Sequence, residues 1–77
     1  MKILYSKHWL RKHLKKRKDI TLDMIEFALN NSSESIDKYW KDAFNAISRI
    51  PPSGRTLKVV YKKSKEKIFI VTTYWLD

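Results

Sequence analysis

Two segments near the carboxyl end decide the fold of this chain: Ser53-Gly54-Arg55-Thr56-Leu57-Lys58-Val59-Val60-Tyr61 and Lys67-Ile68-Phe69-Ile70-Val71-Thr72-Thr73-Tyr74-Trp75. Both are rich in Val, Ile, Thr and aromatic residues, a composition typical of β-strands. The polar stretch Lys63-Ser64-Lys65-Glu66 lies between them and predicts a turn. The carboxyl end therefore predicts a β-hairpin, which is entered through Gly54, the single glycine of the chain.

The second strand of this hairpin is expected to lie inside the sheet. Residues 68–71 are all apolar, so both faces of the strand should be covered by protein. Because side chains alternate along a strand, Thr72 and Tyr74 should share one face, and Thr73 and Trp75 the other. Hydroxyl groups at the end of a strand, in a chain that also carries a basic segment, favour phosphate chemistry over a plain binding surface.

Two helices are expected before the hairpin. Ser6 can cap the first helix, which extends to about Lys18, and Thr21 can cap the second. Residues 22–29 supply the second helix with a broad apolar face, and residues 30–33 end it with side chains that prefer turns.

The two histidines of the first helix are expected to have different surroundings. With a rotation of about 100° per residue, His13 falls within the stripe formed by Trp9, Leu10 and Leu14. His8 falls nearly opposite this stripe. We therefore expect His13 to be packed or hydrogen-bonded, and His8 to face solvent or a ligand.

The remaining segments complete the predicted sheet. Residues 44–50 alternate well enough for a strand, and Pro51-Pro52 forces an extended turn after it. Residues 2–5 form either a short first strand or a lead-in to the helix, and residues 34–43 form either a helical turn or a loop across the sheet. The predicted fold is α+β, a single domain over residues 1–77, with two N-terminal helices packed on a three- to four-stranded antiparallel sheet.

Charge and composition narrow the possible partners. The 77 residues include 17 Lys and Arg against 8 Asp and Glu, which gives a net charge of +9 and a pI near 9.9. Such a balance favours a polyanionic partner, above all a nucleic acid. The absence of cysteine excludes disulfides and thiolate zinc sites, and no metal-ligand spacing is present, so neither metal nor cofactor is expected. No apolar run is long enough to span a membrane, which favours a cytoplasmic location.

Four motifs together resemble a known group of toxins: Ser6-Lys7-His8, Arg17-Lys18-Asp19-Ile20-Thr21, the segment Gly54–Tyr61, and Ile70-Val71-Thr72-Thr73-Tyr74. The resemblance is to the BrnT-like toxins and to a related family with a His…Arg-Gly-Ile…Gly-Arg…Val-Val…Thr-Ala-Tyr pattern. Both groups look like members of the wider RelE-like ribonuclease fold. This chain has Arg17-Lys18-Asp19-Ile20 where the pattern has Arg-Gly-Ile, and Thr72-Thr73-Tyr74 where it has Thr-Ala-Tyr.

The resemblance implies metal-independent RNA cleavage, in which the ribose 2′-hydroxyl attacks the adjacent phosphate. His8 is the candidate acid or base, Arg55 the candidate phosphate clamp, and Tyr74 the group that orients or protonates the phosphate. Cations along the first helix and the hairpin would hold the RNA backbone. These are Arg11, Lys12, Lys15, Lys16, Lys18 and Lys58. Trp40 and Trp75 can stack on bases, although packing in the core or an interface is the more ordinary role of tryptophan in so short a chain.

Three functions follow as hypotheses. The leading one is a toxin-type endoribonuclease that cleaves messenger RNA, free or on the ribosome, and is neutralised by an acidic antitoxin. The second is a nucleic-acid-binding module without catalysis, and the third is a basic domain that docks an acidic protein. A homodimer is left open.

Overall fold

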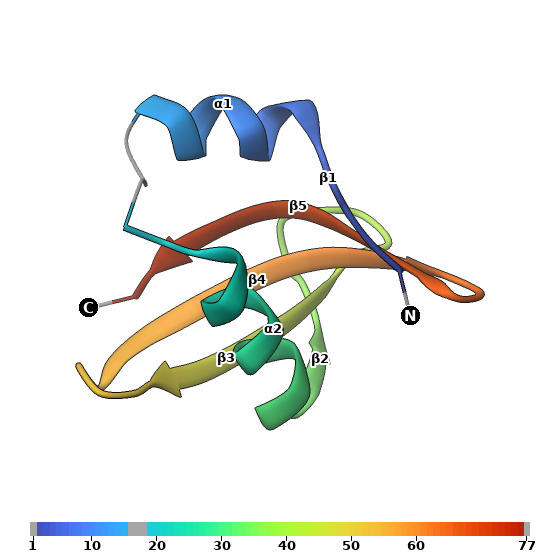
Figure 1. Ribbon diagram of the computed structural model, residues 1–77. Coiled ribbons are helices and arrows are strands. Elements are labelled where there is room, and N and C mark those ends of the chain that lie inside the picture. Colours follow the sequence, from blue (N-terminus) through green and yellow to red (C-terminus); the bar gives the residue numbers. More distant parts are fainter. Residues whose placement is uncertain (1, 16–18, 77) are drawn as a thin grey trace.

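The fold is described by a computed structural model, which defines residues 2–15 and 19–76 (Figure 1). Its elements in chain order are β1 (Lys2–Tyr5), α1 (Lys7–Lys15), α2 (Leu22–Asn31), β2 (Glu34–Ile36), β3 (Phe44–Ile50), β4 (Arg55–Ser64) and β5 (Lys67–Trp75). The α+β class and the two helices agree with the sequence prediction, and both helices follow a first strand.

The sheet differs from the predicted one. It has five strands in the order β1-β5-β4-β3-β2, and it is mixed, since β1 pairs with β5 in parallel while all other neighbours are antiparallel. The prediction of three to four antiparallel strands is therefore met only in part: β3, β4 and β5 are antiparallel neighbours as expected, whereas the sheet has five strands and the pairing of β1 is parallel. Residues 2–5 do form a strand. Parallel strands cannot be joined by a tight turn, and the chain between β1 and β5 accordingly contains both helices and the other three strands. β5 lies between β1 and β4, as its two apolar faces indicated.

Strand β2 carries no local sign of being a strand. Its three residues are all exposed, so there is no burial pattern to reveal it. Contacts with other strands stabilise it. It pairs with β3, and the Glu34 carboxylate accepts hydrogen bonds from Tyr61 Oη (2.7 Å) and Lys63 Nζ (2.8 Å) of β4. Residues 37–43 that follow form a loop, so a helical turn in this region is excluded.

The β4–β5 hairpin is longer than predicted, because β4 continues to Ser64 and the turn consists of Lys65 and Glu66 alone. A β-bulge in β5 opposite Val60 shifts the register, so that Tyr61 pairs with Ile70 while Val59 pairs with Thr73. The bulge brings the Thr73 side chain to the face that carries Ile70. The predicted split of residues 72–75 between two faces is confirmed.

The core lies on one face of this sheet, and both helices cover that face. Trp9 from α1 and Ile25 from α2 belong to the same buried cluster as Leu57 and Ile70 from the sheet. The predicted caps hold the helices in place. Ser6 Oγ accepts the N–H of Trp9 (2.9 Å), and Thr21 Oγ1 accepts that of Met24 (3.2 Å).

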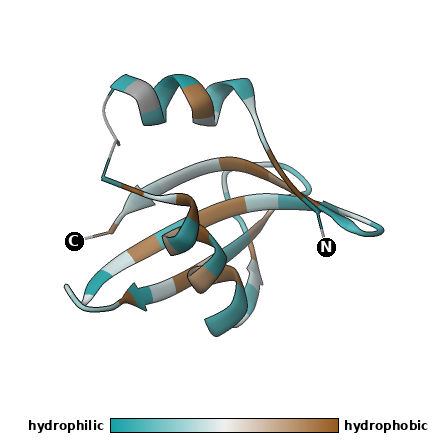
Figure 2. Ribbon diagram, viewed as in Figure 1, coloured by the Kyte–Doolittle hydropathy of each residue, from teal (hydrophilic) through white to brown (hydrophobic). Residues whose placement is uncertain are grey.

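The second face of the sheet is covered only in part. A smaller cluster of Ala43, Val60 and Val71, with Tyr74 packed against it, lies where the loop of residues 37–43 crosses this face. Figure 2 shows the contrast in composition, with apolar residues concentrated in the strands and α2, and hydrophilic ones in α1 and at the β4–β5 turn.

Candidate functional site

Helix α1 presents one strongly basic face. His8, Arg11, Lys12 and Lys15 line a shallow hollow of about 230 Å³. Their spacing of three, four and seven residues from His8 places them on the same side of a helix. The opposite side is packed, since Trp9 is buried and its ring stacks on that of His13 with centroids 4.5 Å apart. The packing predicted for His13 is thus confirmed. His8 is half-buried and lies with Arg11, Lys12 and Lys15, and we call this group the basic face of α1.

His8 lies where this basic face meets the loop of residues 37–43. Its half-buried ring is 5.7 Å from the ring of Trp40, with the two planes inclined at 60°. Ser6 fixes the start of α1 at this point, because its N–H donates to the Ile70 carbonyl (2.9 Å) and its hydroxyl to that of Val71 (2.8 Å). Two hydrogen bonds of Ser6, only two residues before His8, therefore attach this end of α1 to the sheet.

The Asp37 side chain fixes the backbone of this loop. Its Oδ2 accepts the backbone N–H groups of Tyr39 (2.9 Å) and Trp40 (2.6 Å), and its Oδ1 lies 3.5 Å from Lys58 Nζ. Its side chain is only 2% exposed, and that of Lys58 only 19%. Burial by itself would raise the pKa of Asp37, but the two N–H donors and the Lys58 ammonium together outweigh it and lower that pKa.

Lys58 and Tyr74 belong to the same cluster on the second face. They are cross-strand partners, and the Lys58 ammonium lies 5.5 Å from the centre of the Tyr74 ring. Hydrogen bonding with the Tyr74 side chain is the largest influence on the pKa of Lys58 and, aided by Asp37, raises it against the opposing effect of burial. Lys58, predicted as an RNA contact, is thus already paired inside the protein.

Arg55, the predicted phosphate clamp, lies elsewhere. Its Nη1 is 3.3 Å from Asp19 Oδ2, and its guanidinium carbon lies 4.2 Å from the centre of the Trp75 ring. The indole N–H of Trp75 donates to the same Asp19 oxygen (2.8 Å). Arg55 shares the face of Leu57, whereas Tyr74 pairs with Lys58 on the other face, so the sheet separates two of the three predicted catalytic residues.

Sequence reasoning missed Asp37, whose carboxylate holds the loop, and Tyr39, whose side chain the loop exposes. A signal for Asp37 does exist, because an aspartate ahead of a polar stretch commonly accepts the N–H two residues on. Its pairing with Lys58, more than twenty residues away, has no local sign. Lys16 and Lys18, the remaining predicted RNA contacts, lie outside the described residues.

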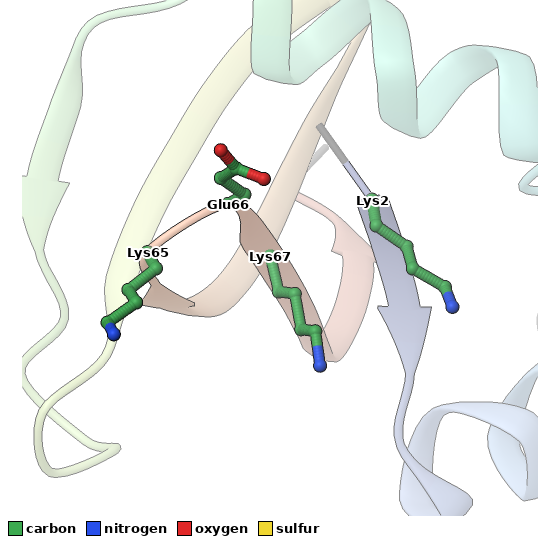
Figure 3. Close-up of a pocket in the computed structure, with 4 residues that line it drawn as sticks. All are labelled: Lys2, Lys65, Glu66 and Lys67. Atoms are coloured by element: carbon green, nitrogen blue, oxygen red, sulfur yellow. The ribbon is translucent and has the colours of Figure 1, made fainter.

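A second basic surface lies at the β4–β5 turn. Lys2, Lys65, Glu66 and Lys67 line an open hollow of about 830 Å³. Lys2 and Lys67 are neighbours in the parallel register, and their side chains extend in the same direction while the Glu66 carboxylate points away (Figure 3). This hairpin cluster consists of three lysines and one glutamate, and it contains no histidine.

Two classes of feature are missing from residues 2–15 and 19–76. No three His, Cys, Asp or Glu side chains there come together as a metal site would require, and neither helix is long and apolar enough to cross a membrane. A scan against protein-family models, a search of curated proteins and a search of solved structures found no match to this chain. Its function must therefore be argued from the site.

Proposed function

We propose that this protein binds RNA along the basic face of α1 and cleaves it as a metal-independent endoribonuclease of the RelE-like type. The observation that carries the proposal is the position of His8 in one hollow with Arg11, Lys12 and Lys15. Three cations at this spacing match a phosphate backbone, and an imidazole among them can exchange protons near neutral pH.

The cations of this face have no acidic partner among the described residues. The ion pairs found among the described residues use other cations, namely Arg55, Lys58 and Lys63, which all belong to β4. Like charges three and four residues apart on a helix repel one another. Binding of a polyanion would relieve this repulsion, which favours an external phosphate chain as the partner.

The cleavage step follows from these groups. His8 takes the proton of a ribose 2′-hydroxyl, and the 2′-oxygen forms a bond to the adjacent phosphorus. The bond between phosphorus and the 5′-oxygen then breaks, and the 5′-oxygen takes up a proton, for which Tyr74 stays the predicted donor. Among the cations of this hollow, Arg11 and Lys12 are the two nearest His8 in sequence, so they replace Arg55 as stabilisers of the charged phosphorane.

A non-catalytic RNA-binding protein is the second candidate. The separation of Arg55 from Tyr74 favours it, because the predicted clamp and the predicted proton donor lie on opposite faces of the sheet. In either case, charge complementarity suits an acidic antitoxin as a second partner in the cytoplasm, bound over the same basic face.

The experiment measures binding and cleavage of a labelled RNA in EDTA. We expect the Arg11→Gln/Lys12→Gln/Lys15→Gln variant to bind far more weakly, and the slope of log affinity against log salt to become shallower by about 2. The matched control is Lys2→Gln/Lys65→Gln/Lys67→Gln, which removes the same charge from the hairpin cluster and should leave the slope almost unchanged. Equal effects of the two triple variants would disprove binding at α1.

His8→Ala separates the two candidates. For the endoribonuclease we expect this variant to bind RNA with nearly unchanged affinity and to lose cleavage, with and without added ribosomes. Salt-dependent binding by the wild-type protein without cleavage under either condition would leave the non-catalytic candidate. Cleavage that persists in His8→Ala would exclude His8 as the acid or base.

A further inference from the structure

The loop of residues 37–43 exposes two large aromatic side chains next to the basic face of α1. Tyr39 is 95% exposed and Trp40 is 39% exposed. Exposed aromatic surface gains nothing for folding, since the hydrophobic contribution of these rings depends on their burial. Two such residues in succession therefore point to contact with something outside the chain.

This loop is firmly built. The buried Asp37 carboxylate holds the backbone N–H groups of both aromatic residues and pairs with Lys58. Two backbone hydrogen bonds close the loop, from Asp37 N to the Ala43 carbonyl (2.9 Å) and from Ala43 N to the Trp40 carbonyl (3.2 Å). The backbone that carries the exposed rings is thus fixed before any partner arrives, and little entropy is lost on binding.

The position of Trp40 connects the loop with the basic face. Its ring lies 5.7 Å from that of His8, the first residue of the hollow that Arg11, Lys12 and Lys15 continue. A ligand that reaches both surfaces must combine closely spaced negative charges with flat, apolar rings. A nucleic acid strand has both, provided that its bases are not already paired.

We propose that Tyr39 and Trp40 form a stacking platform for an unpaired base, so that the RNA bound along α1 is single-stranded. The proposal rests on RNA binding as the proposed function and names the form of RNA that binds. In an A-form duplex the bases are stacked on one another and paired, and a side chain on the protein surface cannot reach their flat faces. Trp75 does not take this role, because its ring is occupied by Arg55 and Asp19.

The effect of removing the platform can be calculated from typical stacking strengths. Base–aromatic stacking corresponds to about a 5- to 150-fold gain in affinity for each base. Because a stacked base releases no counterions, Trp40→Ala should weaken binding of single-stranded RNA by this factor and leave the salt dependence unchanged. Trp40→Phe should keep most of the affinity, and Trp75→Phe is the matched control at a partly buried tryptophan.

The experiment compares a fluorescent single-stranded RNA, the same sequence in a duplex, and the same strand with abasic sites. We expect the wild-type protein to favour the intact single strand over the abasic one by the factor that Trp40→Ala loses. The abasic comparison needs no variant, so a folding defect in Trp40→Ala cannot obscure the result.

Several outcomes would overturn the platform. Equal affinity of the wild-type protein for intact and abasic strands would do so, as would equal weakening of duplex and single-strand binding in Trp40→Ala. If Trp40→Ala weakened binding of a polyglutamate peptide but not binding of RNA, the loop would be assigned to an acidic protein partner. Salt-dependent binding of all three RNAs alike would leave the proposed function intact, whereas no binding of any RNA would remove both proposals.

Discussion

The replacement Asp37→Asn tests whether one buried carboxylate holds the loop of residues 37–43 on the sheet. The change preserves the shape of the side chain and removes its charge. Asparagine has a single oxygen, which can accept the backbone N–H groups of Tyr39 and Trp40 or face the Lys58 ammonium, but cannot do both as the carboxylate does.

The expected loss of stability follows from these contacts. Two hydrogen bonds to a charged acceptor become bonds to a neutral one, which weakens them by about 1 kcal/mol in all. Removing one partner of a buried ion pair costs about 3–5 kcal/mol when the pair is fully buried. Lys58 keeps 19% exposure and its contact with Tyr74, so the lower part of that range applies. Together with the weakened hydrogen bonds we expect a total of about 4 kcal/mol, a large part of the ~4–12 kcal/mol typical of a chain of this size.

Urea denaturation over a range of pH provides the measurement. The lowered pKa of Asp37 means that its contribution to stability is complete above the ordinary value of 3.8 and is lost as the pH falls through the lower pKa of the folded protein. The difference in stability between wild type and Asp37→Asn should therefore be constant from neutral pH to about pH 5 and shrink below that. A difference that stays constant down to pH 2, or grows with acid, would refute the reasoning.

The variants Lys58→Met and Asp37→Asn/Lys58→Met complete a double-mutant cycle. Because removal of both charges leaves no unpaired ion, the double variant should be more stable than the sum of the single losses predicts, by at least about 1 kcal/mol. A coupling energy close to zero would mean that the ion pair contributes nothing.

Two further predictions concern polar contacts elsewhere in the fold. Thr73→Val removes the acceptor of the buried Trp9 indole N–H (2.9 Å) and should destabilise the protein by about 1–3 kcal/mol in urea denaturation. Thr73→Ser keeps the hydroxyl and should lose less stability. A smaller loss for the Val variant than for the Ser variant would disprove a role for this hydrogen bond. Hydrogen bonds from Lys63 and then Tyr61 lower the pKa of Glu34, so its contribution is present above the ordinary value of 4.5 and lost in acid. Since the Glu34 side chain is 37% exposed, Glu34→Gln should cost less than about 1 kcal/mol at neutral pH by thermal denaturation, with Glu66→Gln as the control of equal charge.

The parts of the fold that depend on neighbours in sequence could be predicted. The caps Ser6 and Thr21, the apolar face of α2 and the hairpin all express patterns contained within a few residues. The orientation of His8 away from the core follows from helical periodicity in the same way. Such features need no knowledge of what lies across the sheet.

The parts of the fold that depend on residues distant in sequence could not be predicted. Strand β2 exists through its pairing with β3 and through contacts of Glu34 with β4, neither of which leaves a mark in three exposed residues. The separation of Arg55 from Tyr74 depends on strand register, which the two-residue turn and the bulge in β5 determine together. A change of one residue in either would reverse the faces.

The positions of the acidic residues affect both the stability of the sheet and the charge of the candidate site. Within the described residues, Asp19, Glu34 and Asp37 each neutralise a cation of β4, and through these pairs they also hold Trp75, strand β2 and the aromatic loop in place. The carboxylates that stabilise the sheet are thereby unavailable to α1. Positive charge outside these ion pairs remains on the basic face of α1, beside His8 and Trp40, and in the hairpin cluster. The pairs that complete the sheet thus leave the basic face of α1 without an acidic partner among the described residues, which is the condition on which the proposed binding of RNA depends.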